Sequence, residues 1–210
     1  MYDLEEQEKI DALKGWWHDN RATVVVVAAV GLATYAGMGA WKSWKAREAD
    51  QAAQQYVIFQ AAAAGGDAGK TAAAAQTIEA VAASSPFAAR AALAAAQALA
   101  GAGKAAEAQA QYQWVVDHAK EVELQALARV RLAGVLADAK KYDDALHVLD
   151  SGIDPAFATL AGDRKGDILL AQGKPAEARA AYQQALQAAE GNHPLKPALQ
   201  AKLDALGAGQ

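Results

Sequence analysis

The stretch GGDAGKT, residues 65–71, contains the residue types of a phosphate-binding loop. Such a loop requires a glycine, four further residues and then Gly-Lys-Ser/Thr, so that backbone N–H groups can surround the phosphates. Gly69, Lys70 and Thr71 supply the end of this pattern, but Ala64 stands where the first glycine belongs. The preceding residues continue an Ala- and Gln-rich helical pattern, whereas a phosphate-binding loop follows a buried strand. A nucleotide-binding enzyme that uses this stretch is therefore only an alternative interpretation.

No other grouping of reactive side chains in the sequence indicates catalysis. The four histidines are scattered without metal-ligand spacing, cysteine is absent, and there is no Gly-x-Ser-x-Gly motif. Asp143 and Asp144 are adjacent, but they fall in the first turn of a predicted helix, where the helix dipole favours acidic residues. We therefore expect a protein that is not an enzyme, with no catalytic residue, no metal and no cofactor.

The composition predicts an all-α protein. Hydrophobic residues make up 53% of the 210 residues, and much of this share is alanine, which is the best helix former. Runs such as AARAALAAAQALA, residues 88–100, are helical in almost any context, whereas β-branched residues concentrate only in TVVVV, residues 23–27. The formal net charge is −4 and no basic stripe is present, so nucleic acid is not an expected partner.

One segment, residues 22–41, is predicted to cross a lipid bilayer. It contains 20 residues without a charge, and a helix of that length spans about 30 Å, the thickness of the hydrocarbon core. Tryptophan is found at both borders, as in the aromatic belts of membrane spans, at Trp16, Trp17, Trp41 and Trp44. The long, mostly acidic leader differs from that of a cleaved signal peptide, so we expect an uncleaved anchor.

The orientation of this span does not follow from charge. The positive-inside rule counts Lys and Arg near the ends of a span. Three of these residues precede the segment and three follow it, namely Lys9, Lys14 and Arg21 on one side and Lys42, Lys45 and Arg47 on the other. The rule therefore gives a tie.

A repeat of about 34 residues follows the span. Four similar stretches, each with a predicted turn between two helices, are GKTAAA (69–74), GKAAEA (103–108), KKYDDA (140–145) and GKPAEA (173–178). Their final alanines are separated by 34, 37 and 33 residues, which is typical of stacked helical hairpins. In this alignment Lys70 corresponds to Lys104, Lys141 and Lys174, so GGDAGKT becomes one of four equivalent corners between helices.

Apolar residues recur at fixed positions around these corners. Small residues occupy one position before the corner and leucines another, at Ala96, Ala133 and Gly166 and at Leu99, Leu136 and Leu169. Large residues recur one turn after the corner alanine, at Ile78, Tyr112, Leu149 and Tyr182. Small residues allow the helices of a hairpin to approach, and large ones fill the space between hairpins.

These features resemble the tetratricopeptide repeat, most closely in residues 166–186, GDILLAQGKPAEARAAYQQAL. The whole chain resembles the YfgM-like family of ancillary subunits of the bacterial SecYEG translocon, because an acidic N-terminus, one span that ends in W-x-x-W and degenerate repeats occur in that order. The resemblance implies an inner-membrane protein with a cytoplasmic segment (1–21), a transmembrane helix (22–41), and a periplasmic stalk and repeat domain (42–210). It also implies that SecYEG and a membrane-anchored periplasmic chaperone of the PpiD type are partners.

By analogy with tetratricopeptide repeats, the first helices of the hairpins line a concave face that binds proteins. The residues predicted to lie on this face are Arg90, Gln97, Gly134, Asp138, Asp163 and Asp167. A last helix, which begins at Pro197 and ends at Gly207, is predicted to cap the final hairpin with its leucines. The expected function is a membrane-anchored protein-interaction scaffold at the translocon, with a scaffold for another cell-envelope assembly machine as a further alternative.

Overall fold

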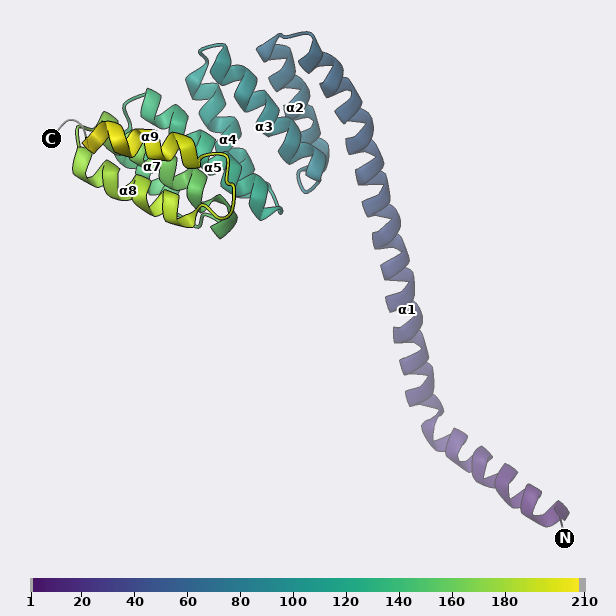
Figure 1. Cartoon of the computed structure of the whole chain (residues 1–210). Helices are drawn as coiled ribbons and strands as arrows, with labels where there is room; N and C mark the ends of the chain where they lie inside the picture. Colours follow the sequence, from purple (N-terminus) through teal and green to yellow (C-terminus); the bar gives the residue numbers. More distant parts are fainter. Residues whose placement is uncertain (1, 208–210) are drawn as a thin grey trace. The chain divides into compact units, whose positions relative to one another are not determined.

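The computed structural model describes residues 2–207, with side chains from residue 6 onward, and these residues form helices and no strand (Figure 1). The predicted all-α class is confirmed. Contacts divide the chain into two compact units, one up to Glu48 and one from Ala49 onward. The first helix, α1 (Tyr2–Ala64), contributes to both units.

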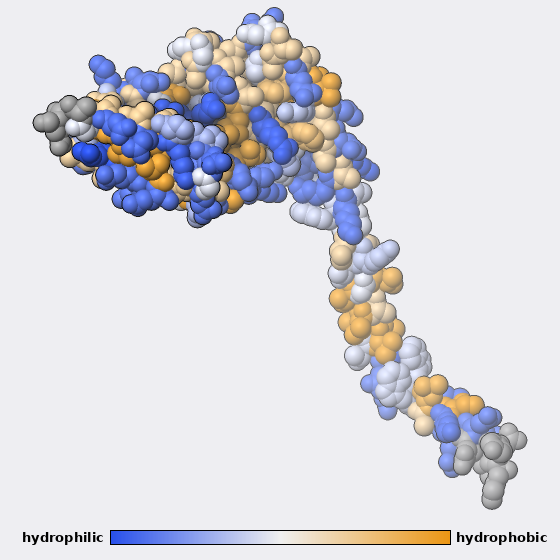
Figure 2. Space-filling view, in the orientation of Figure 1, coloured by the Kyte–Doolittle hydropathy of each residue, from blue (hydrophilic) through white to orange (hydrophobic). Residues whose placement is uncertain are grey.

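In the first unit, the apolar segment of α1 exposes its side chains. Val27, Leu32 and Tyr35 are 65%, 71% and 80% exposed, and Figure 2 shows a hydrophobic band along this helix. The hydroxyl of Thr34 donates a hydrogen bond to the carbonyl of Val30 at 2.8 Å. The hydroxyl thus has a partner within the helix, which lipid could not provide. By length and composition, this is the one helix in the described part of the chain that could cross a membrane.

The second unit consists of helices that pack in chain order (Figure 1). Successive pairs form antiparallel hairpins, in which the last turns of α1, α3, α5 and α7 are the first helices and α2, α4, α6 and α8 are the second helices. The bounds are α2 (Ala68–Ala82), α3 (Pro86–Gly101), α4 (Ala105–His118), α5 (Val122–Asp138), α6 (Tyr142–Asp150), the short 3₁₀ helix η1 (Pro155–Phe157), α7 (Ala158–Ala171), α8 (Pro175–Ala188) and α9 (Lys196–Gly207).

Alanine forms much of the core of this unit. Ala96 and Ala133 are fully buried, Gly166 is buried, and the three leucines predicted to pack beside them are at most 5% exposed. Gly166 is required because a Cβ there would overlap the ring of Tyr182 on α8. The end of α1 joins the same core through Phe59, which is 3% exposed. The predicted small residues and leucines before the corners are therefore confirmed.

Three of the four corners have the same backbone geometry. The second residue after the end of the first helix adopts a left-handed φ at Gly103, Lys140 and Gly173, with values of 75°, 60° and 77°. The next residue is a lysine, and its backbone N–H donates a hydrogen bond to the carbonyl of the leucine five residues earlier. The distance is 2.9 Å in each of the pairs Lys104–Leu99, Lys141–Leu136 and Lys174–Leu169. This bond closes the helix end as in a Schellman motif.

The first corner corrects the sequence alignment by three residues. The alignment matches Gly69 and Lys70 with the corner glycines and lysines, but both lie inside α2. Gly66 instead has the left-handed φ, at 72°, and Asp67 is the cap of α2. The side chain of Asp67 accepts a hydrogen bond from the N–H of Lys70 at 3.0 Å, which fixes the helix start there.

The same shift moves the residues that follow the first corner. Thr71, which is 2% exposed, occupies the position of the buried corner alanines, whereas Ala74 is half-buried. Ile78 is buried as predicted, but it lies one turn beyond the position held by Tyr112. Ile78 is therefore buried because it lies on the inner face of α2, and not because it is equivalent to Tyr112, as the alignment assumed.

The last helix, α9, covers the end of the final hairpin as predicted, although it begins at Lys196. Leu199 is fully buried and Leu203 is 8% exposed, and both join the core formed by Tyr182 and its neighbours. The helix therefore acts as a cap, which a stack of hairpins needs where its core would otherwise meet solvent.

Candidate functional site

Hollows lie between the first helices of successive hairpins. The first hollow, of about 210 Å³, lies between α3 and α5 beside an aromatic ring of α4, and its lining residues are Arg90, Leu93, Ala94, Gln97, Tyr112, Leu127 and Arg131. The second hollow, of about 290 Å³, lies between α5 and α7, and its lining residues are Gly134, Ala137, Asp138, Tyr142, Arg164, Asp167, Ile168 and Ala171. A third hollow, of about 310 Å³, lies between the end of α1 and α3 and shares Ala94 and Gln97 with the first, so the repeat produces this kind of depression between neighbouring first helices.

Five of the six residues predicted for the protein-binding face line these hollows. Arg90 and Gln97 line the first hollow, and Gly134, Asp138 and Asp167 line the second. Asp163 lines neither and instead forms an ion pair with α9, as described below. The structure therefore brings the predicted residues together as two groups rather than as one continuous surface.

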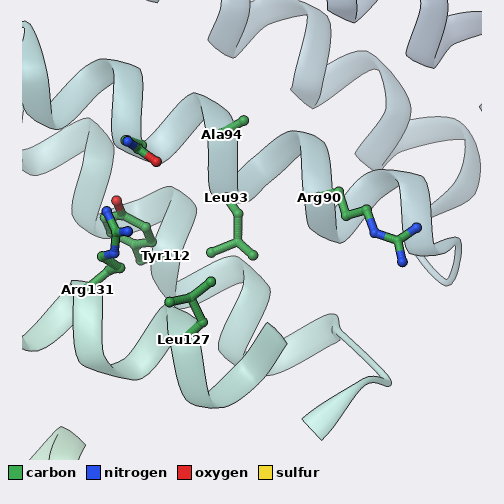
Figure 3. A pocket seen from close by; sticks show the side chains of 7 residues that line it. Arg90, Leu93, Ala94, Tyr112, Leu127 and Arg131 are labelled. Carbon is green, nitrogen blue, oxygen red and sulfur yellow. The ribbon is translucent and has the colours of Figure 1, made fainter. Parts of the chain in front are cut away.

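The first hollow has an apolar centre with an arginine at each end (Figure 3). Leu93 and Leu127 lie in the centre, and both are partly exposed. The side chain of Tyr112 is 2% exposed and lines the hollow next to Arg131 (Figure 3). Burial raises the pKa of the Tyr112 hydroxyl, and the neighbouring Arg131 guanidinium opposes this shift.

The second hollow has mixed charge. Asp138 and Asp167 contribute carboxylates, and Arg164 contributes a guanidinium that lies against Gly134. The Cζ atom of Arg164 is 3.8 Å from the position that a Cβ at Gly134 would take. This is an ordinary van der Waals distance, so an alanine would also fit at this position.

Asp163 and Asp167 are engaged by the C-terminal helix. The ammonium of Lys202 on α9 lies 2.6 Å from Asp163 Oδ1 and 2.7 Å from Asp167 Oδ1, and Tyr182 donates its hydroxyl to Asp167 at 2.7 Å. Burial lowers the pKa of Lys202, but the two carboxylates more than offset this effect, so the pKa is raised overall. Burial, followed by the bond to Asp167, raises the pKa of Tyr182 strongly. This network attaches α9 to the last hairpin.

Sequence reasoning missed two arginines of the hollows, Arg131 and Arg164. Both occupy the same repeat position, two residues before the small residues Ala133 and Gly166, and Ala94 occupies it in the second hairpin. The signal was present in the repeat alignment, because this position lies one helical turn before the predicted residues Gln97, Gly134 and Asp167 on the same helix face.

The GGDAGKT stretch lacks the geometry of a phosphate-binding loop. The carboxylate of Asp67 accepts the N–H of Lys70, an amide that a phosphate would need, and Thr71 donates its hydroxyl to the Asp67 carbonyl at 2.8 Å. The hydrogen bond from the Lys70 N–H lowers the pKa of Asp67 and keeps a negative charge at the start of α2. A polyphosphate would be repelled from this position.

A model of the tetratricopeptide repeat-like domain matches residues 14–208. The chain belongs to this family. The match includes the apolar helix as well as the repeats, and it agrees with the four hairpins and capping helix described above.

Three relatives are each named ancillary SecYEG translocon subunit. The Haemophilus influenzae protein is 27% identical over 89% of this chain and 91% of its own length, and the Escherichia coli protein is 26% identical over 85% of each. The Neisseria gonorrhoeae protein is 43% identical over 93 residues, a match that spans only 44% of each protein. The resemblance to the YfgM-like family is confirmed by these relatives.

Proposed function

We propose that this chain is a membrane-anchored ancillary subunit of the SecYEG translocon that binds proteins through the hollows of its repeat unit. The observation that carries the proposal is that two relatives of that name match 89% and 85% of the chain. The family match, which begins at residue 14, covers both the apolar helix and the repeats, so the parts needed for anchoring and for binding occur together.

Anchoring to the membrane allows protein contacts of low affinity to support association. The apolar segment of α1 has the length and composition of a membrane span, and its large side chains are exposed. A tether of this kind raises the effective concentration of a binding surface toward the millimolar range. Shallow hollows of modest volume can therefore contribute to association at the membrane without high intrinsic affinity.

The finer parts of the proposal rest on the family resemblance. They are a cytoplasmic N-terminus, periplasmic repeats, and a link between the translocon and a membrane-anchored chaperone of the PpiD type that assists translocated proteins. The Lys and Arg residues around the span give equal weight to either orientation. We propose no catalytic role, since the corner at Asp67 is arranged as a helix cap.

Crosslinking in native inner membranes tests the proposal. A photoreactive amino acid at Leu32, which is 71% exposed, should form an adduct with a SecYEG subunit, and one at Ala94 in the first hollow should form adducts with a periplasmic or translocating protein. Adducts from both positions that never contain a translocon subunit or its chaperones would favour another cell-envelope machine.

Protease treatment of intact spheroplasts tests the orientation separately. Protease should digest the repeats and leave residues 1–20 intact. Protection of the repeats until the inner membrane is disrupted would show the inverse orientation and would remove the periplasmic part of the proposal.

A further inference from the structure

The first hollow differs from its surroundings in charge. The whole chain has a formal net charge of −4, yet this hollow is lined by two arginines and no acidic residue. Among the residues whose side chains the structure describes, neither Arg90 nor Arg131 forms an ion pair, although Arg131 has a neutral neighbour in Tyr112. Two guanidinium charges therefore remain available to an incoming group.

The apolar centre of the hollow is also available. Leu93 and Leu127 lie between the two arginines, and the buried ring of Tyr112 lies to one side of them, next to Arg131 (Figure 3). Arg90 extends from α3 at one end, and Arg131 extends from α5 at the other, beside Tyr112 (Figure 3). An apolar centre with a charged rim is the usual arrangement of a protein-binding hot spot, and arginine and tyrosine are enriched there.

We propose that the first hollow binds an acidic–apolar peptide segment, with one apolar side chain between Leu93 and Leu127 and carboxylates at Arg90 and Arg131. Guanidinium groups match carboxylates in charge and in planar, bidentate geometry. The proposal rests on the proposed function and deepens it by naming the chemistry of the bound segment. Carboxylates come from Asp and Glu side chains or from a free C-terminus, and the test below separates these sources.

A comparison with the second hollow explains why the acidic segment is assigned to the first. Its lining contains Asp138 and Asp167 in addition to Arg164, so it would repel a cluster of carboxylates. Asp167 is already bound by Lys202 and Tyr182, which leaves Asp138 as an acidic group without an ion pair among the described side chains. An acidic segment should therefore select the hollow between α3 and α5 over the one between α5 and α7.

Peptide binding to the purified full chain in a neutral detergent tests this inference. The probe is a fluorescent, N-acetylated and C-amidated peptide Gly-Asp-Asp-Leu-Asp-Asp-Gly, measured by fluorescence polarisation. Matched peptides replace every Asp by Lys, or the Leu by Ser, and a further pair ends at Leu with either a free or an amidated C-terminus. We expect binding of the acidic–apolar peptide that weakens with salt, weaker binding of the Ser peptide, and none of the Lys peptide.

Charge-reversal variants locate the binding. Arg90→Glu and Arg131→Glu should each lower the affinity about tenfold, because each change removes an attraction and adds a repulsion of similar size. Arg129→Glu is the matched control. Arg129 lies on α5, as Arg131 does, but its guanidinium donates a hydrogen bond to the carbonyl of Gly152 at 3.4 Å. This variant should leave the affinity within about twofold. Ala94→Glu, which places a carboxylate in the hollow without removing a buried group, should weaken binding as well.

Three results would overturn the inference. These are equal binding of the Lys peptide, an equal loss of affinity in Arg129→Glu, and displacement of the acidic peptide by anionic lipid micelles as effectively as by unlabelled peptide. Because the assay contains no translocon, such a failure would leave the crosslinking test of the proposed function unaffected. Helical circular dichroism of each variant shows that a loss of affinity is not a loss of folding.

Discussion

Residues 22–41 of α1 and the helix α3 are both rich in small apolar residues, yet they meet opposite surroundings. The α1 segment has no charge over 20 residues and exposes Val27 and Leu32, whereas α3 is 16 residues long and buries Ala95 and Ala96 completely. At about 1.5 Å per residue, α3 would not reach across the hydrocarbon core. It also carries Arg90 and Gln97 on its exposed face. Length and a polar face, more than overall hydrophobicity, separate a membrane span from a core helix.

The largest effect is expected from charges in the α1 segment. Val27→Asp combined with Leu32→Asp should release the chain from the membrane, because each carboxylate near the centre of a span costs roughly 2.5–3.5 kcal/mol. Fractionation after alkaline carbonate treatment measures this release. The control, Ala94→Asp with Gln97→Asp on the exposed face of α3, should stay in the membrane fraction. Equal retention of both variants would remove the distinction between the two helices.

A substitution in the repeat unit should act on folding and not on anchoring. Gly166→Ala should lower the free energy of unfolding by roughly 1–3 kcal/mol, because its Cβ would overlap Tyr182. Thermal unfolding followed by circular dichroism measures the change. Gly134→Ala is the control, since its Cβ would meet Arg164 only at ordinary contact distance, and it should unfold at the same temperature or a higher one. An unchanged melting temperature for Gly166→Ala would contradict the packing of α7 on α8.

The attachment of α9 should make a smaller contribution. Lys202→Met removes the partner of Asp163 and Asp167 and should lower stability by about 1 kcal/mol, a value reduced by the partial exposure of the lysine. Since the folded-state pKa of Lys202 is raised, this contribution is complete below the ordinary lysine pKa and is lost as the pH rises through the folded value. Urea unfolding at neutral and strongly alkaline pH measures the difference.

The control for α9 is Lys165→Met, which breaks an exposed pair with Asp150 and should change stability very little. If the two lysine variants lost the same stability, or if the Lys202→Met difference persisted at strongly alkaline pH, the network on α7 and α9 would not act as described.

The smallest effect is expected at the third corner. Lys140 adopts the left-handed φ that glycine adopts at the other three corners, so Lys140→Gly should stabilise the repeat unit by on the order of 0.5 kcal/mol. Differential scanning calorimetry measures the gain. The neighbouring Lys141 has a φ of −86° and therefore no strain to relieve, so Lys141→Gly should bring no such gain. A gain in Lys140→Gly no larger than that in Lys141→Gly would show that the corner does not strain Lys140.

The sequence was sufficient to predict the apolar segment, the helical hairpins and the capping helix, because each leaves a local or periodic pattern. It was insufficient at the first corner, where three glycines within five residues allow two alignments and only the left-handed φ of Gly66 selects one. Asp67 is a residue type preferred at the start of a helix, and its position before an alanine-rich run could have indicated the correct choice.

The candidate site was less predictable than the fold. Asp163 and Asp167 are four residues apart on one helix face, which is visible in the sequence, but their partner Lys202 lies 39 and 35 residues away and is brought to them only by the packing of α9. Pairing across that distance leaves no periodic signal. Arg131, in contrast, could have been found from its equivalence with Arg164.

Co-purification tests the central proposal, an anchored subunit of the translocon, most directly. Membranes that contain the tagged chain are solubilised in a mild detergent, the chain is captured, and SecY is detected in the eluate by immunoblot. We predict that SecY elutes with the wild-type chain and with Lys165→Met, and that it is lost with the Val27→Asp and Leu32→Asp double variant. Recovery of SecY no greater than with an unrelated single-span protein would contradict the proposal.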